Sequence, residues 1–151
     1  MIQRKYYEDY QIGDTFETAS LTITESHLVQ WAGLTQDFYP LHMDAEYAAT
    51  TVMKERVAHG PFLFALSVGQ MCLKEWINYD AIIAWLGSDI KMLKPVRIGD
   101  TVHVLAEVTE MRETSKPHQG IQIWLYKVIN QKGEVVMENT MKFMMHRKPQ
   151  E

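Results

Sequence analysis

The run GPFLFALSVGQMCL, residues 60–73, is the most apolar stretch of the chain, and the rest of the sequence has to pack around it. Pro61 suits the first turn of a helix, where its missing N–H would have had no intrahelical acceptor. Apolar residues then fall on every face of that helix, so it must be enclosed. Because burying each large apolar side chain is worth about 1.5–3 kcal/mol, we predict that this helix forms the core and begins at Gly60 or Pro61. Gly69, which is unfavourable in a helix by about 1 kcal/mol, indicates close packing against a neighbour.

Length and charge exclude several classes of protein. The 151 residues fit one domain, residues 1–151, and 15 Lys and Arg stand against 19 Asp and Glu without a basic run, so no nucleic acid partner is expected. The apolar run is shorter than the roughly 20 residues needed to cross a bilayer, so no membrane partner is expected. Cys72 is the single cysteine and the N-terminus has no signal-peptide pattern, which together predict a cytoplasmic protein.

The remaining sequence is mostly strand-like. The third of four predicted strands after the helix, GIQIWLYKVIN, alternates through Ile121, Ile123 and Leu125, and NQKGE at residues 130–134 supplies the turn to the fourth. Strands are predicted at residues 14–23, 81–93, 101–111, 120–130 and 134–146.

Two shorter helices are predicted between the first strand and the apolar run. Thr22 and Glu25 have capping-box spacing, which predicts a helix over residues 25–34. Asp44 is typical of the N-cap of a second short helix. The stretch TQDFYPLHMD, residues 35–44, is predicted to be an irregular loop between them, because its proline prevents simple continuation of a helix.

This order of elements predicts an α+β domain in which an antiparallel sheet curls around one long central helix. That is the hot-dog fold. A single sheet wrapped on one helix leaves exposed edge strands and an open face, so we expect a homodimer with a continuous sheet, or a higher homo-oligomer.

The predicted loop holds an acid, Asp37, and an imidazole, His42, five positions apart around a proline. Either residue alone would be interpreted as an ordinary turn or surface residue. The chain soon returns with RVAHGP, where free N–H groups at the start of the long helix can hold a developing negative charge. An acid, an imidazole and an oxyanion site together form a candidate reaction centre.

The segments WAGLTQDFYPLHMDAEYA, RVAHGPFLFALSVG and KMLKPVRIGDTV resemble the MaoC-like dehydratases and (R)-specific enoyl-CoA hydratases, and the resemblance spans residues 10–146. Those families have a motif of Gly, Asp, any residue, Asn, Pro, a hydrophobic residue and His, followed by an Ala-His-Gly entry to the central helix. Asp37, Pro40 and His42 keep the internal spacing of that motif.

The resemblance implies that Asp37 and His42 are the catalytic pair that activates one water, and that the backbone N–H of Gly60 holds the thioester oxygen. Two residues depart from the motif. Gln36 stands where the motif has Gly, which predicts a different loop backbone. Tyr39 stands where it has Asn, which removes a side chain that would orient the pair.

The implied reaction adds water reversibly to an enoyl-CoA thioester and gives a 3-hydroxyacyl-CoA. It needs a base for the water, an acid for the α-carbon and stabilisation of the enolate oxygen, roles that a carboxylate, an imidazole and a backbone N–H can fill. No cofactor is expected, since CoA is part of the substrate, and no metal, since the histidines lack HxxxH or HxH spacing. The candidates for substrate contacts are Tyr39, Pro40, His59, Pro61 and Phe62.

Two other functions stay open at this stage. A hot-dog thioesterase would share the fold, the dimer and the CoA ligand, but such enzymes commonly need a carboxylate on or near the central helix, and residues 60–73 contain none. A non-catalytic acyl-CoA binding subunit is the second, and Tyr39 in the motif is the feature that favours it.

Overall fold

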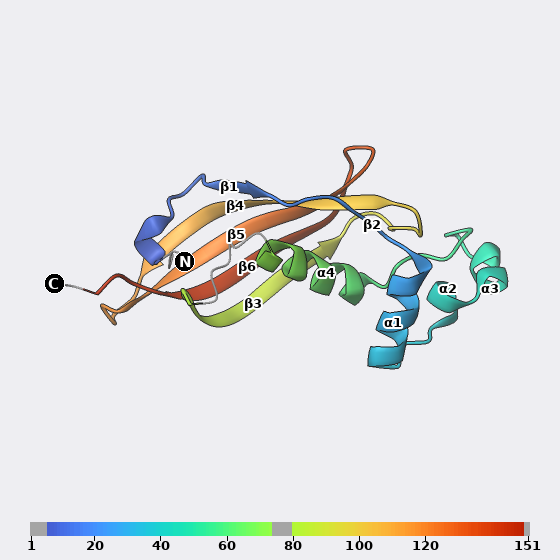
Figure 1. Ribbon diagram of the computed structural model, residues 1–151, viewed down its shortest axis with the longest axis horizontal. Helices are drawn as coiled ribbons and strands as arrows, with labels where there is room; N and C mark the ends of the chain where they lie inside the picture. Colours follow the sequence, from blue (N-terminus) through green and yellow to red (C-terminus); the bar gives the residue numbers. More distant parts are fainter. Residues whose placement is uncertain (1–5, 74–79, 150–151) are drawn as a thin grey trace.

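The computed structural model describes residues 6–73 and 80–149, which form one antiparallel sheet, a long helix on the sheet and three shorter helices at one end (Figure 1). In chain order the elements are η1 (Tyr7–Asp9), β1 (Thr15–Glu17), β2 (Leu21–Thr22), α1 (Glu25–Thr35), α2 (Pro40–Met43), α3 (Ala45–Thr50), α4 (Gly60–Leu73), β3 (Ile82–Met92), β4 (Thr101–Glu113), β5 (Gln119–Asn130) and β6 (Val135–His146).

The six strands form one sheet in the order β1-β4-β5-β6-β3, with the short β2 also pairing with β4. Every pairing is antiparallel. Helix α4 lies along one face of this sheet, and α1, α2 and α3 gather beyond its N-terminal end (Figure 1). The predicted α+β hot-dog class is therefore confirmed, and β3 is left at an edge of the sheet.

The core lies between α4 and the sheet. Alternate residues of β5 are buried, in accord with the two-residue period of a strand, and Trp124 and Tyr126 are among the largest fully buried side chains. The buried set on β5 also contains Gln122. Its side chain accepts from Trp124 Nε1 at 3.0 Å and donates to the Tyr7 carbonyl at 3.2 Å, so this buried amide is satisfied.

The entry into the first helix differs from the prediction. The strand predicted at residues 14–23 is split into β1 and β2, because Thr18 between them turns its hydroxyl to the N–H of Val104, at 2.8 Å. The N-cap of α1 is Thr24, whose N–H donates to Nδ1 of His27 at 3.0 Å, so the predicted Thr22 cap is wrong. The side chain of Asp44 accepts from the N–H of Tyr47 at 3.0 Å, which confirms Asp44 as the N-cap of α3.

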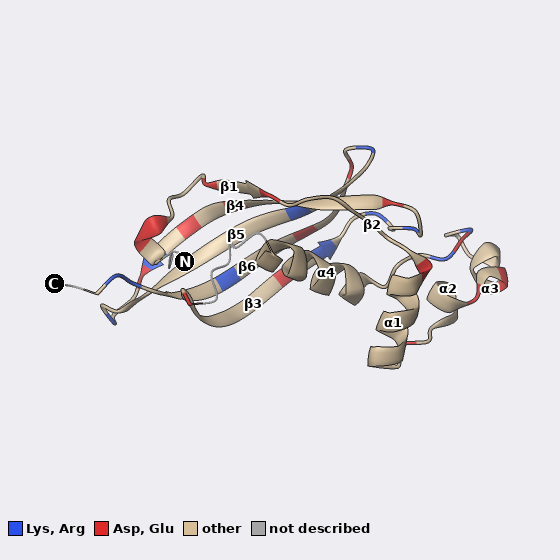
Figure 2. Ribbon diagram, in the orientation of Figure 1, with Lys and Arg blue, Asp and Glu red and all other residues tan. Residues whose placement is uncertain are grey.

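Helix α4 begins at Gly60, as predicted, but it is not enclosed on every face. Pro61, Ala65, Gly69 and Leu73 are exposed and recur every fourth residue, which places them on one stripe. A Cβ added at Gly69 would meet nothing within 4 Å, so residues 6–73 and 80–149 do not supply the close neighbour that was predicted for it. Figure 2 shows that α4 carries no charged residue. No helix among the described residues is long and apolar enough to cross a membrane.

Candidate active site

The first residue of the candidate site, Asp37, directly follows the C-cap of α1. The C-cap is Gln36, in the left-handed conformation with φ 64° and ψ 17°, and the Gln36 N–H donates to the Ala32 carbonyl at 2.7 Å. Left-handed backbone is the conformation in which glycine is unstrained, so Gln36 occupies a turn that a glycine would adopt without strain. The expectation that Gln36 gives a loop backbone different from that of the family stays a prediction. The stretch that follows is less irregular than predicted, because Pro40–Met43 form the short helix α2 with Pro40 at its first position.

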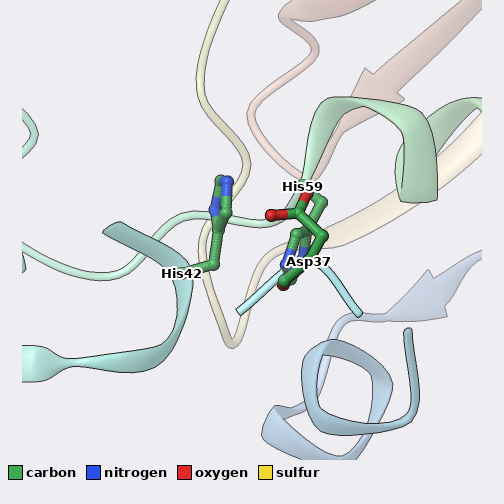
Figure 3. A group of neighbouring side chains, drawn as sticks. All are labelled: Asp37, His42 and His59. Carbon is green, nitrogen blue, oxygen red and sulfur yellow. Dashed lines mark hydrogen bonds between the residues drawn. The ribbon is translucent and has the colours of Figure 1, made fainter. Parts of the chain in front are cut away.

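Three side chains from this turn, α2 and the entry to α4 meet in one cluster. Ligand-type atoms of Asp37, His42 and His59 all lie within 4.8 Å of one another. Figure 3 shows the Asp37 carboxylate directed toward the His42 ring, with His59 behind Asp37. The structure thus brings the two predicted catalytic residues together, although they come from the end of α1 and from α2.

The tautomer of His42 follows from its hydrogen bond. Nδ1 of His42 lies 2.7 Å from the backbone carbonyl of Val57. A carbonyl oxygen only accepts, so Nδ1 carries a proton, and in the neutral ring Nε2 carries the lone pair. This arrangement leaves Nε2 as the atom of His42 that can take a proton from water.

His59 is held in a comparable way. It is fully buried, and its Nε2 donates to the backbone carbonyl of Asp37 at 3.0 Å. Its Nδ1 is buried and has no hydrogen-bond partner within the described ranges. Burial lowers the pKa of His59 below its ordinary value, and the nearby His42 ring lowers it further, whereas the hydrogen bond to Asp37 opposes both effects. His59 is therefore a neutral imidazole at physiological pH.

The other predicted site residues differ in how near they lie to this cluster and in how exposed they are. Gly60 directly follows His59 and opens α4, and its N–H has no intrahelical acceptor. Tyr39 is half exposed, with its ring centroid 5.7 Å from that of His42, and Pro40 is exposed beside it. Pro61 lies on the exposed stripe of α4. Phe62 is almost fully buried. Its ring packs edge-on against Trp31 and stacks with His27, so it belongs to the core between α1 and α4.

Two pockets adjoin this region. One of about 320 Å³ includes Gly60 and is lined otherwise by Met53, Val57, Ala58 and residues 92–96. The other, of about 470 Å³, is apolar and begins one turn further along α4, at Phe64; beyond Phe64 it is lined by Ala65, Val68, Cys72, Ile82, Trp85, Met141 and Phe143.

Sequence reasoning missed the contribution of Val57. Its side chain is buried, and the part that matters is the main-chain carbonyl that orients His42. Every residue has a main-chain carbonyl, so the residue type at position 57 could not have indicated that this carbonyl accepts from His42. His59 had a signal, its position beside Gly60, but its contacts with the pair could not be read from the sequence.

Comparison with known proteins identifies the family of this chain. Residues 9–124 match the family described as MaoC like domain. The chain is 38% identical over 104 residues to an (R)-specific enoyl-CoA hydratase of Rhodospirillum rubrum, a match covering 69% of each chain. It is also 38% identical over 117 residues to the protein MaoC of Klebsiella aerogenes, which covers 77% of this chain. That match spans only 33% of the length of the Klebsiella protein.

Solved structures show the same fold. A protein from Archaeoglobus described as a monoamine oxidase regulatory protein superposes with a TM-score of 0.93 at 33% identity, covering 99% of both chains. A conserved hypothetical protein of Mycobacterium tuberculosis with a double hot-dog fold gives a TM-score of 0.84 at 19% identity. The match covers 97% of this chain and 46% of that one.

Proposed function

We propose that this chain, which belongs to the MaoC-like domain family, is a hydro-lyase that adds water reversibly to an enoyl-CoA thioester to give a 3-hydroxyacyl-CoA. The observation that carries the proposal is the convergence of Asp37 and His42, with the lone pair of His42 on Nε2. A carboxylate and a neutral imidazole held together can bind and deprotonate one water between them.

The order of events follows from the groups present. Asp37 and His42 hold the water, which attacks the β-carbon of the enoyl group as its proton passes to the pair. The thioester oxygen gains negative charge as the enolate forms, and the N–H of Gly60 donates to it. The α-carbon is then protonated from the same pair, so no metal and no cofactor other than the CoA of the substrate is required.

The structure contains an apolar pocket that could bind the acyl chain of the substrate. The apolar pocket of about 470 Å³ starts at Phe64, one turn beyond Gly60, and runs along α4 toward Cys72. In this proposal the alkyl chain of the thioester occupies that pocket, where burial of each CH₂ contributes about 0.8 kcal/mol. Acyl-CoA is therefore the substrate class that we assign to this site.

The working unit in this proposal is a homodimer. The edge strand β3 exposes several large apolar side chains, and the exposed stripe of α4 is apolar as well. An unpaired edge and an apolar helix face are both unfavourable in water, and a second copy can cover them together.

Incubation of the pure protein with a panel of enoyl-CoA and 3-hydroxyacyl-CoA thioesters tests the reaction. Loss of enoyl absorbance without release of free thiol supports hydration. Release of thiol instead would indicate a thioesterase. The observation that favours this second function is the Asp37 carboxylate, which lies within 4.8 Å of a ring nitrogen of His59, the residue before α4. Thioester binding with neither signal would indicate a non-catalytic binding subunit.

A further inference from the structure

His59 is not a member of the proposed catalytic pair, but it contacts both Asp37 and His42. Its ring lies 3.9 Å from the His42 ring, centroid to centroid, with the planes tilted by 31°. Its Nε2 donates to the carbonyl of Asp37. One fully buried side chain at the entry to α4 therefore links the end of α1 to α2.

The link to Asp37 is the shortest hydrogen bond that fixes this residue within the part of the chain that the structure describes. The Asp37 N–H reaches Thr35 Oγ1 at 3.3 Å, and the Tyr39 N–H reaches Asp37 Oδ1 at 3.4 Å, whereas the bond from His59 is 3.0 Å long. Bonds near 3.0 Å are the stronger ones. The bond from His59 therefore holds the main chain from which the Asp37 carboxylate extends.

The second nitrogen of His59 argues against a merely space-filling role. Nδ1 is buried without a hydrogen-bond partner in the described residues, which an apolar side chain of similar size would avoid. Most buried polar side-chain atoms have a hydrogen-bond partner, so a buried Nδ1 without one among the described residues calls for an explanation. Because His59 is neutral, it packs on His42 without placing a second positive charge beside it when His42 takes up a proton.

We propose that His59 is a positioning residue, which sets the carboxylate of Asp37 through the Asp37 carbonyl and sets the ring of His42 by packing against its face. This inference rests on the proposed function. It assigns to the residue before Gly60 a role in assembling the pair, distinct from contact with the substrate.

Two variants separate the two contacts. His59→Gln keeps an amide N–H near the position of Nε2 but removes the ring, whereas His59→Phe keeps a ring against His42 but removes the donor. Each should lower kcat by up to about 10²-fold, the scale of an ångström misplacement, while the KM for the enoyl-CoA stays close to the wild-type value. His103→Gln is the matched control, since His103 lies on β4 with Glu17 as its partner, and should keep wild-type kinetics.

A double-mutant cycle distinguishes positioning from loss of stability. If His59 acts through the pair, Asp37→Asn/His59→Phe should have nearly the kcat of Asp37→Asn alone, whereas losses that multiply would overturn the proposal. A wild-type kcat in both single variants would also overturn it and would leave hydration itself intact. If the wild-type protein hydrates no enoyl-CoA, the proposed function fails instead.

A measurement on the wild-type protein tests the proposal even if the His59 variants do not fold and even if no activity is detected. In ¹⁵N NMR spectra of the imidazoles, the proposal requires the proton of neutral His59 on Nε2 and that of neutral His42 on Nδ1. A His59 proton on Nδ1 would remove the bond to Asp37 and overturn the proposal.

Discussion

Nδ1 of His42 lies 2.7 Å from the carbonyl oxygen of Val57, 15 residues further along the chain. This hydrogen bond orients the ring and leaves Nε2 as the acceptor. A main-chain carbonyl therefore selects the tautomer of His42, the proposed base, in which Nδ1 carries the proton. The same carbonyl belongs to the segment that leads into His59 and Gly60, so the position of the base depends on the entry to α4.

Removing either member of the pair should nearly abolish hydration. Asp37→Asn and His42→Ala should each lower kcat for enoyl-CoA hydration by about 10²–10⁴-fold, the usual contribution of a positioned acid or base. The double variant should fall close to the worse single variant, since groups that act as one unit are not additive. Steady-state kinetics at constant pH measures this, with direct binding of the thioester as the control, because the pair does not hold the CoA arm. Normal hydration by both single variants would contradict the assignment.

His59 should make the protein less stable in acid. Its folded pKa is lowered by burial from the ordinary 6.5, so below that pH the unfolded chain binds a proton that the folded chain does not. The free energy of unfolding should therefore fall as the pH drops below about 6.5, by at most about 1.4 kcal/mol per pH unit for one proton. Urea unfolding from about pH 5 to pH 8 should show a shallower slope for His59→Gln than for the wild type. An unchanged slope, with His103→Gln as the control, would show that His59 is not the group responsible.

The helices and strands could largely be predicted because they depend on local patterns. Pro61 after Gly60 marks the start of α4, and the period of two marks β4, β5 and β6. The face of β5 could not be predicted, since apolar residues occur at both parities. Ile121 and Ile123 suggested one face, but the structure buries the set that contains Gln122, whose amide finds partners in Tyr7 and Trp124.

The site was predictable only as far as residue types and spacing reach. Asp37 and His42 could be identified from their spacing around Pro40. Their contacts with Val57 and His59 join residues 15 and 22 positions apart, and one side of each contact is a backbone carbonyl. Such contacts follow from the packing of the whole chain. The exposed stripe of α4 was missed for a related reason, because an apolar pattern alone does not show which faces of a helix the rest of the chain covers.

Gln36→Gly should stabilise the protein. Gln36 has a φ of 64°, where a residue with a Cβ is strained by about 1–2 kcal/mol, and glycine is not. Part of this gain is offset by the greater entropy of glycine in the unfolded chain, so the free energy of unfolding should rise by about 0.5–1 kcal/mol. Urea unfolding measures the change. Lys54→Gly, at a φ of 66°, is the matched control and should behave in the same way. A loss of stability at Gln36 alone would show that its side chain makes a favourable contact.

Gly120→Ala should destabilise the packing of the N-terminal segment on the sheet. A Cβ at Gly120 would lie 2.5 Å from Cδ2 of Tyr7, a buried ring that also lies under the Arg147 guanidinium, 5.5 Å from its centroid. Overpacking of this kind costs about 1–3 kcal/mol. Gly33→Ala is the control, since a Cβ at Gly33 in α1 meets nothing within 4 Å and should stabilise the helix by about 0.5–1 kcal/mol. Thermal unfolding of both variants checks the prediction, and equal melting temperatures would contradict it.

Gly69→Arg should convert a dimer into a monomer. Gly69 lies in the middle of the stripe formed by Pro61, Ala65 and Leu73, and apart from the backbone of α4 itself no atom of the described residues lies within 4 Å of an added Cβ. An arginine is therefore tolerated by the isolated chain, but it would place a bulky charge in an apolar interface with a second copy, where an unpaired buried charge is strongly unfavourable.

Sedimentation velocity should give the mass of a dimer for the wild type and of a monomer for Gly69→Arg, with circular dichroism confirming that the variant folds. Gly33→Arg, on the exposed side of α1, is the matched control and should remain a dimer. Hydration activity should fall with the dimer, because the described residues leave the apolar pocket beside α4, β3 and β6 partly open, and in this proposal a second copy covers the bound acyl group. A wild-type protein that is monomeric and fully active would show that one chain suffices. That result would contradict the proposed homodimer but not the proposed catalytic role of Asp37 and His42.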